Sequence, residues 1–392
     1  MSLRILWHSN APWVSTGYGN QTRLFVPRIQ ALGHEVVLSN FYGLAGGVLN
    51  LDDKTKCLPC GMNPWGNDVL AAHAAHAKAD IVITLMDAWV LSPEATSKVR
   101  WCPWVPVDHD PCAPPVVTAL KSAWQPIAYS KFGQAKLKEA GFDPRYVPHG
   151  VDTKAFRPID RSECRKALKW SESAFIAMMV AANKGTPSRK AIPEVLVAWR
   201  HFVERHPDSL LYLHCWPTPE MQGVNVPEIL QNLHMPDKAV LLADPYYTMI
   251  GYPESFLINV YNAANVLVNP SYGEGFGIPI LEAQACGTPV IVGENTSMPE
   301  LRFAGWSVKG QPIWSPQGSW QFVPNIPQIE QALEAAWMKR ENQQVRQQAR
   351  RGAERYDADR VAANYWKPLL EEIEQNIHVG GELQMVDLKA AS

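Results

Sequence analysis

Three alternate glycines stand between an apolar run and a short helical pattern in the second half of the chain. They are Gly273, Gly275 and Gly277. Pro279 favours the first turn of a helix here, and Gly287 is well placed to end it. The glycines let the backbone approach a ligand closely, and their N–H groups join the positive end of the helix dipole. The pattern therefore predicts a phosphate site at this turn.

Two carboxylates flank the predicted phosphate site from different sides. Glu274 lies within the glycine turn, and Glu282 lies in the first turns of the helix. Because carboxylates accept hydrogen bonds from sugar hydroxyls, one ligand explains both features, namely a sugar joined to a nucleotide through phosphates. Glu274 would bind the transferred sugar and Glu282 the ribose. The alternative is a tight turn with a capped helix, in which Glu274 is solvated and Glu282 only favours the helix start.

The spacing of these glutamates resembles the Glu-x7-Glu signature of the family-4 glycosyltransferases, which are retaining enzymes of the GT-B fold. The stretch 274–291, EGFGIPILEAQACGTPVI, carries the resemblance. Segments 128–137, 147–158 and 261–271 are similar to the same family in the same order, so the resemblance runs from about residue 4 to about residue 372. It implies a catalytic role for Glu274. It also implies donor contacts from Gly275, Phe276, Gly277 and Glu282.

The same resemblance implies that cations of the second domain bind the donor diphosphate. Lys190 stands at the position of the family lysine, with Arg189 beside it, whereas the position of the family arginine holds Asn183 or Lys184. Cations at a diphosphate neutralise the charge that grows on the leaving group. The alternative is a basic helix start on the protein surface.

Polar residues also follow strand-like apolar runs in the first half of the chain. Gly17 and Gly19 follow the first run, and Asp87 ends the run DIVITLMD. Ligands bind at the carboxyl ends of parallel strands, so these residues are predicted to reach the same cleft, the glycines on the donor side and Asp87 on the acceptor side. Alternatively, the glycines serve only the turn, and Asp87 only caps the next segment.

The segment 105–111, VPVDHDP, follows another strand-like run and is predicted to face the cleft for the same reason. His109 resembles the histidine that family members place beside the transferred sugar. Asp108 and Asp110 compete for a role there, with Asp110 as a candidate on the acceptor side. A structural histidine is the alternative.

A rival pattern comes from two cysteines and two histidines. Cys57, Cys60, His73 and His76 give Cys-x2-Cys-x12-His-x2-His, which is close to zinc-finger spacing but one residue short in the histidine pair. Histidines three residues apart do share a helix face. Against a zinc site, the histidine helix is mostly alanine and is predicted to pack on a parallel sheet.

Strand and helix patterns alternate along most of the chain. Strands are predicted at 3–8, 36–39, 80–85, 104–107, 126–130, 175–180, 210–214, 240–242, 266–269 and 289–292. Helices are predicted at 20–32, 67–78, 328–348 and 359–377. This alternation favours an α/β fold with parallel sheets covered on both faces. With the resemblance, it predicts a GT-B fold of two doubly wound Rossmann-like domains that face each other across a cleft.

The turn-rich segment 146–158 marks the predicted domain boundary. We expect an acceptor-binding domain at 1–150 and a nucleotide-sugar-binding domain at 151–355. A helix at 356–378 is expected to cross back to the first domain, and 379–392 is expected to be a tail.

Composition excludes several other classes of protein. The chain has 392 residues, 46% of them hydrophobic and 19% charged, with a net charge of -2, which argues against disorder and against a general attraction to polyanions. No apolar run approaches the roughly 18 residues of a membrane-spanning helix, although peripheral membrane contact stays open. Seven scattered cysteines favour reduced thiols and a cytoplasmic location. The basic segment 338–360 reads as a solvated helix face, with binding of an anionic acceptor as the alternative.

The sequence and the resemblance together predict transfer of a sugar from a UDP- or GDP-type donor to an acceptor, with retention at the anomeric carbon. We expect neither a metal ion nor a cofactor other than this substrate. The acceptor stays open among saccharide, lipid, protein and nucleic acid. The alternatives are a nucleotide-sugar epimerase or hydrolase of the same fold, and a zinc-dependent nucleic-acid-binding module. A dinucleotide dehydrogenase is disfavoured because Thr22 stands where its third glycine is required.

Overall fold

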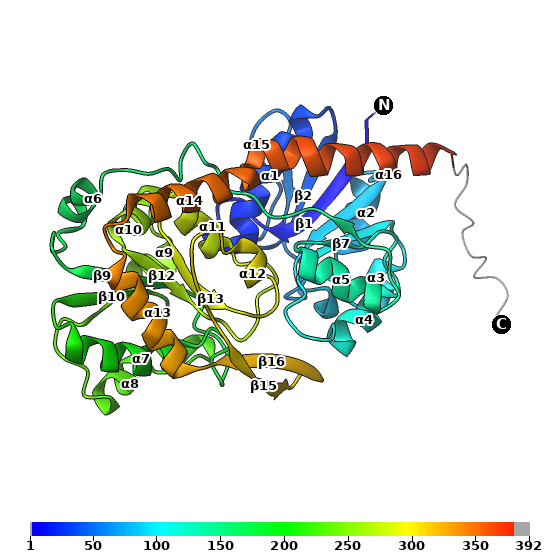
Figure 1. Ribbon diagram of the computed structural model, residues 1–392. Helices are drawn as coiled ribbons and strands as arrows, with labels where there is room; N and C mark the ends of the chain where they lie inside the picture. The colour runs from blue at the N-terminus through cyan, green and yellow to red at the C-terminus, as the bar shows by residue number, and fades with distance from the viewer. Residues whose placement is uncertain (1, 380–392) are drawn as a thin grey trace.

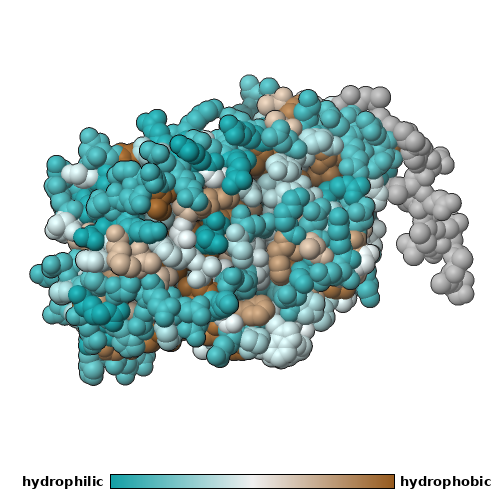
Figure 2. All heavy atoms as spheres, in the orientation of Figure 1, coloured by the Kyte–Doolittle hydropathy of each residue, from teal (hydrophilic) through white to brown (hydrophobic). Residues whose placement is uncertain are grey.

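The computed structural model describes residues 2–379 and consists of two α/β halves, each built on its own sheet (Figure 1). Helices cover both faces of the sheets, which confirms the predicted fold class. Figure 2 shows hydrophilic side chains over most of the face seen in Figure 1. Within residues 2–379, no helix combines the length and the apolar character that a membrane span requires.

The first sheet has eight strands in the order β3-β4-β2-β1-β5-β6-β7-β8, and every pairing except that of β3 is parallel. Its strands are β1 Arg4–Asn10, β2 Glu35–Tyr42, β3 Leu49–Asn50, β4 Lys56–Leu58, β5 Ile81–Leu85, β6 Trp101–Val105, β7 Ile127–Ala128 and β8 Arg145–Tyr146. Its helices are α1 Gly17–Ala31, α2 Leu70–His76, η1 Ala88–Val90, α3 Pro93–Thr96, α4 Pro114–Leu120 and α5 Lys131–Glu139. The strand order reverses beside β1, so the loops after β1 and β5 diverge there and leave a crevice at the carboxyl ends.

The second sheet is parallel throughout, in the order β11-β10-β9-β12-β13-β14. Its strands are β9 Phe175–Val180, β10 Ser209–His214, β11 Val240–Leu242, β12 Val266–Asn269, β13 Val290–Gly293 and β14 Gly305–Val308. Its helices are α6 Arg161–Leu168, α7 Ile192–Arg205, η2 Pro219–Met221, α8 Val226–Asn232, α9 Pro245–Ile250, α10 Glu254–Ala263, α11 Ile278–Ala285, α12 Met298–Leu301, α13 Ile326–Met338 and α14 Gln343–Ala353. Here the order reverses between β9 and β12.

A separate hairpin joins the two halves. It consists of β15 Gly310–Ser315 and β16 Ser319–Pro324, which pair antiparallel. The Asp110 N–H donates to the Trp320 carbonyl at 3.1 Å, and the Ser319 hydroxyl donates to the Pro111 carbonyl at 2.5 Å. The hairpin therefore extends from the second half onto the loop that follows β6.

The C-terminal segment returns from the second half to the first (Figure 1). It comprises η3 Glu354–Tyr356, α15 Ala358–Val361, the π-helical turn η4 Ala362–Trp366 and α16 Lys367–Val379. The Trp366 ring is fully buried, with its centroid 5.6 Å from that of Trp7 and 4.9 Å from that of Trp104. The segment thus completes the core under the first sheet. Of the predicted tail, Val379 is the last residue of α16, and 380–392 lie outside the described residues.

Several predicted boundaries in the first half were wrong. The strand predicted at 104–107 is β6, Trp101–Val105, and the helix predicted at 20–32 begins earlier, so that Gly17 and Gly19 form the first turn of α1. The side chain of Thr16 accepts a hydrogen bond from the Gly19 N–H at 3.1 Å, and this cap outweighs the poor helix propensity of glycine. The helix predicted at 67–78 is shorter, Leu70–His76, because the Asn67 side chain bonds the backbone beyond β5 instead.

The helix predicted at 328–348 is two helices, α13 and α14. The chain leaves the helical path after Met338, and Asn342 starts a new helix. The Asn342 side chain accepts hydrogen bonds from the N–H groups of Gln344 and Val345 at 2.9 Å and 3.3 Å. The basic segment 338–360 therefore spans a turn and several short elements, not one continuous face.

We expect Asn342→Ala to lower the free energy of unfolding by about 0.5–2 kcal/mol, because two N–H groups at the start of α14 lose their acceptor. Chemical denaturation measures this loss. Gln347→Ala, which changes an exposed position inside the same helix, is the matched control and should cost nothing. Equal stability of the wild type and Asn342→Ala would show that the cap does not define the start of α14.

Candidate active site

The candidate site lies where the strand order of the second sheet reverses. Two loops meet there, one at 181–191 after β9 and one at 270–277 after β12. Asn269 ties them together, since its amide nitrogen donates to the Val180 carbonyl at 3.1 Å. The Tyr272 N–H also donates to the Arg189 carbonyl at 2.8 Å. The topology thus brings together residues that are more than 80 positions apart in sequence.

A buried ion pair stands at the centre of the site. The Lys190 Nζ lies 2.5 Å from the Glu274 Oε1, and the Ser271 hydroxyl donates to the same oxygen at 2.6 Å. Glu274 is only 7% exposed. Burial acts to raise the pKa of Glu274, but the charges of Lys190 and Arg189 outweigh burial and hold this pKa below its ordinary value. The carboxylate is therefore ionised at neutral pH.

Arg189 extends the ion pair toward the first half. Its Nη1 lies 4.0 Å from Glu274 Oε2 and 3.8 Å from Asp108 Oδ2, and it donates to the Gly273 carbonyl at 2.9 Å. Two cations and two carboxylates from both halves are thus assembled within one cluster. Such a cluster can bind a diphosphate with its cations and sugar hydroxyls with its carboxylates.

His109 lies beneath this cluster and both of its ring nitrogens have partners. Its Nδ1 is 2.7 Å from Asp108 Oδ1, and its Nε2 is 2.9 Å from the Ser315 hydroxyl of the hairpin. The side chain is only 3% exposed. Burial opposes ionisation of Asp108, but the hydrogen bond from His109 and the charge of Arg189 lower the pKa of Asp108 below its ordinary value. In this arrangement His109 orients Asp108, and Asp108 faces the cluster.

Asp110 does not join the cluster. Its carboxylate is 2.8 Å from the Lys136 Nζ of α5, and its backbone bridges to Trp320. Asp108 and Asp110 have the Asp-x-Asp spacing of many metal sites, which the expectation of metal-free transfer overlooked. The two side chains turn to separate partners, however, and no group of three His, Cys, Asp or Glu side chains within residues 2–379 is arranged to hold a metal.

The glycine turn packs directly against the first half. A Cβ placed on Gly273 would lie 2.1 Å from the Asp108 carbonyl oxygen, and one on Gly275 would lie 2.4 Å from the Pro106 Cβ. The absence of side chains at both positions therefore lets the two halves touch. We had predicted that these glycines admit a phosphate, whereas the close approach that the structure shows is to protein.

The start of α11 retains the features predicted for it. Gly277 precedes the helix with a φ of 105°, in the left-handed region, and Pro279 lies in the first turn. Phe276 is buried against the other half, with its ring centroid 5.1 Å from that of His149. Gly17 of α1 lies opposite, because a Cβ there would contact the Ile278 Cδ1 at 3.4 Å. The N-terminal ends of α1 and α11 therefore face each other across the site.

Asp87 follows the carboxyl end of β5, in the first half. Burial, and then the charge of Asp108, raise the pKa of Asp87 to about 6. Arg189 opposes this rise, so Asp87 belongs to the same electrostatic cluster. Gly19, in contrast, is buried under the carbonyls of Ala11 and Val14 and serves the turn.

Glu282 lies inside α11 and is buried against α10. The Tyr261 hydroxyl donates to its Oε2 at 2.8 Å. Burial raises the pKa of Glu282 to about 7. The pKa of Glu282 therefore lies above its ordinary value, whereas the two cations beside Glu274 hold the pKa of that carboxyl below its ordinary value.

We expect Glu282→Gln to flatten the pH dependence of stability. The folded carboxyl holds its proton up to about pH 7, whereas the ordinary value is 4.5, so the folded state binds the extra proton between these values. The wild type's unfolding free energy therefore falls as the pH rises through this window, and that of Glu282→Gln falls less. Chemical denaturation of both proteins across the window measures the difference. Parallel curves of unfolding free energy against pH would show that Glu282 does not titrate in this window.

The predicted substitute for the family arginine is not part of the cluster. Lys184 is exposed in the loop after β9. Asn183 is buried, and its amide nitrogen donates to the carbonyls of Trp216 and Val224 at 2.9 Å and 2.7 Å. Neither residue reaches Glu274, so Arg189 and Lys190 are the two cations at the site.

The rival zinc pattern is not assembled. Cys57 is buried in β4, and the His73 Nδ1 lies 2.8 Å from the Ser39 hydroxyl. His76 ends α2. These residues pack against the first sheet, and the four side chains do not converge on one point.

The hairpin was missed from the sequence. The alternation 310–315, GQPIWS, followed by the turn residues PQG and by 319–324, SWQFVP, is typical of two short strands and would have revealed it. The role of Ser315 at His109 had no comparable signal, because it depends on the packing of the two halves.

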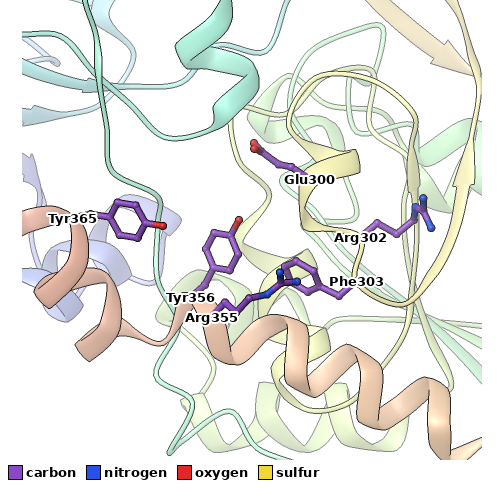
Figure 3. Close-up of a pocket in the computed structure, with 6 residues that line it drawn as sticks. All are labelled: Glu300, Arg302, Phe303, Arg355, Tyr356 and Tyr365. Atoms are coloured by element: carbon purple, nitrogen blue, oxygen red, sulfur yellow. The ribbon is translucent and has the colours of Figure 1, made fainter.

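A cavity of about 480 Å³ lies outside the cluster, where the C-terminal segment meets the second half (Figure 3). It is lined by Glu300, Arg302, Phe303, Arg355, Tyr356 and Tyr365. The Arg355 guanidinium stacks over the Phe303 ring at 4.9 Å. Glu300 accepts a hydrogen bond from the Lys131 N–H at 2.9 Å, which holds α12 against the start of α5. The contact between Glu300 and Lys131 joins the two halves here.

Comparison with known proteins matches part of the chain to a family. Residues 218–313 match the family described as Glycosyl transferases group 1. D-inositol 3-phosphate glycosyltransferase of Actinosynnema mirum is 34% identical over 156 residues, which are 39% of this chain and 36% of that protein. The same enzyme of Saccharomonospora viridis is 36% identical over 160 residues, 40% of this chain and 35% of that protein. The chain thus matches about a third of the length of these relatives.

Solved structures are similar over nearly the whole chain. Sucrose-phosphate synthase from Thermosynechococcus elongatus aligns with a TM-score of 0.70 at 18% identity, over 96% of this chain and 99% of that one. Anabaena HepE in complex with UDP-glucose aligns with a TM-score of 0.66 at 15% identity, over 94% of this chain and 100% of that one. The chain therefore has the GT-B fold of glycosyltransferases, and its segment 218–313 is similar to the family Glycosyl transferases group 1.

Proposed function

We propose that this protein transfers a sugar from a nucleotide diphosphate sugar to an acceptor, with retention at the anomeric carbon. The observation that carries the proposal is the cluster of Lys190, Arg189 and Glu274 at the strand-order reversal of the second sheet. Two cations there suit a diphosphate, and a buried, ionised carboxylate suits the hydroxyls of the sugar attached to it. The family match and the UDP-glucose complex of HepE support the same assignment.

The proposed chemistry assigns the protein an orienting role. Lys190 and Arg189 stabilise the negative charge that develops on the leaving diphosphate, and the acceptor proton passes to the leaving phosphate oxygen on the same face of the sugar. Glu274 orients the transferred sugar. The cations provide this charge stabilisation, so we propose that the transfer is independent of metal ions.

The proposal is tested by titrating UDP, GDP and ADP sugars into the full chain by calorimetry and by measuring donor hydrolysis without acceptor. We expect binding of a UDP or GDP sugar and slow hydrolysis that EDTA leaves unchanged. The configuration of the released sugar, read by NMR at early times, should match that of the donor. Failure of all nucleotide sugars and of the free diphosphates to bind would exclude the proposed function.

A further inference from the structure

Five of the loops at the carboxyl edge of the first sheet contain no lysine and no arginine, whereas the chain after β7 and β8 carries Lys131, Lys154 and Arg157. The five loops follow β1, β2, β4, β5 and β6 and cover 11–16, 43–48, 59–69, 86–92 and 106–113. They carry four aspartates, at 68, 87, 108 and 110. Lys136 pairs with Asp110, and Arg189 faces Asp87 and Asp108. These five loops therefore offer no cation of their own for a second anion.

The same loops present three tryptophan side chains to solvent. Trp13, Trp65 and Trp89 are 42%, 42% and 45% exposed. Each follows a different strand of the sheet, namely β1, β4 and β5. Trp89 stands two residues beyond Asp87. Large aromatic side chains held in water on loops at the carboxyl edge of a parallel sheet are typical of a binding surface.

Hydrogen bonds hold the loops that carry these tryptophans in place. The Trp13 Nε1 donates to the Gly43 carbonyl at 2.9 Å. The Asn67 amide nitrogen donates to the Val90 carbonyl at 2.9 Å, which ties the Trp65 loop to the Trp89 segment. The indoles are therefore presented on fixed loops, so binding there orders little.

An unpaired acceptor atom lies at the same edge. Asn10, the last residue of β1, is 7% exposed, and its Oδ1 has no hydrogen-bond partner while its nitrogen donates to the Thr16 hydroxyl at 2.7 Å. This oxygen is itself buried, so the half-buried Asp87 carboxylate is the acceptor that the edge offers to a ligand. A carboxylate suits hydroxyl donors and repels phosphate.

We propose that the acceptor is an unphosphorylated saccharide that stacks on Trp13, Trp65 and Trp89 and donates hydroxyl hydrogens to Asp87. A sugar ring offers apolar C–H faces to the indoles and hydroxyls at its rim, which matches this combination of groups. The inference rests on the proposed function. It departs from the relatives named D-inositol 3-phosphate glycosyltransferase, because a phosphate would meet carboxylates without a countercharge. An anionic lipid surface is disfavoured for the same reason, since it binds through lysine and arginine.

The test is calorimetry on the full chain saturated with the nucleoside diphosphate that it binds. The probes are maltotriose, cellotriose and mannotriose, then glucose 6-phosphate and inositol 3-phosphate, then vesicles of phosphatidylglycerol and phosphatidylcholine. We expect at least one neutral trisaccharide to bind about tenfold or more tightly than either phosphorylated probe. Trp89→Ala and Trp13→Ala should each weaken the binding of that trisaccharide about tenfold or more.

Met338→Ala is the control, because this side chain is 70% exposed at the end of α13 in the second half, outside the proposed surface. It should leave trisaccharide binding unchanged, and all variants should retain the melting temperature of the wild type. Tighter binding of a phosphorylated probe, binding to vesicles alone, no saccharide binding, or saccharide binding that survives both tryptophan changes would overturn the inference. Failure of the proposed function is distinguishable, since it removes nucleoside diphosphate binding and donor hydrolysis.

Discussion

Glu274→Gln is expected to lower turnover by about one to two decades while the affinity for the nucleoside diphosphate stays at or above that of the wild type. The carboxylate neutralises Lys190 at 2.5 Å, so its removal leaves two cations facing the diphosphate with less competition. The transferred sugar loses a charge-assisted hydrogen bond, which is worth about 1.5–3 kcal/mol. Calorimetry with the diphosphate and initial rates of donor hydrolysis separate the two effects.

Lys190→Met is the matched control for this prediction. It removes the cation from the same pair and leaves Glu274 buried without its lysine. It should therefore lower both the affinity for the diphosphate and the turnover. Either substitution breaks the buried pair, at a cost of about 3–5 kcal/mol, so the folding of both variants is checked by the melting temperature. If Glu274→Gln lowered the affinity for the diphosphate by the same factor as the turnover, Glu274 would act through Lys190 and not on the sugar.

The second sheet could be predicted from sequence except for its edge strand β14, which has no counterpart among the predicted strands. The strands β9, β11 and β12 have the predicted bounds, because buried parallel strands read as unbroken apolar runs with turn residues at their ends. The glycine turn and the short helix α11 followed from local rules on proline and glycine. These features depend on residues near one another in the chain, and a single sequence records them directly.

The pairing inside the site could not be predicted in the same way. Lys190 and Glu274 are 84 residues apart, and no local pattern shows that one neutralises the other. Sequence reasoning assigned the lysine to the diphosphate and the glutamate to the sugar as separate contacts. Likewise, Thr16 draws Gly17 and Gly19 into α1 although glycine alone disfavours a helix. Tertiary contacts and helix caps determine the structure at such positions.

Gly273→Ala is expected to reduce turnover about a hundredfold while nucleotide binding persists. The new Cβ would lie 2.1 Å from the Asp108 carbonyl oxygen, which is backbone of the other half. Neither backbone can yield within its own half, so the two halves must move apart by roughly an ångström. A misplacement of about 1 Å at a reacting centre costs about a hundredfold in rate. The diphosphate contacts Arg189 and Lys190 of the second half alone in our proposal, so its affinity should hold.

Gly47→Ala is the control for this change, because a Cβ at Gly47 meets no atom within 4 Å. It should retain the turnover of the wild type. Calorimetry with the diphosphate, initial rates with the donor and small-angle scattering on both variants complete the test. Wild-type turnover in Gly273→Ala would mean that catalysis does not need the contact between the glycine turn and Asp108. Loss of diphosphate affinity as well as turnover would instead mean that the first half helps to hold the nucleotide.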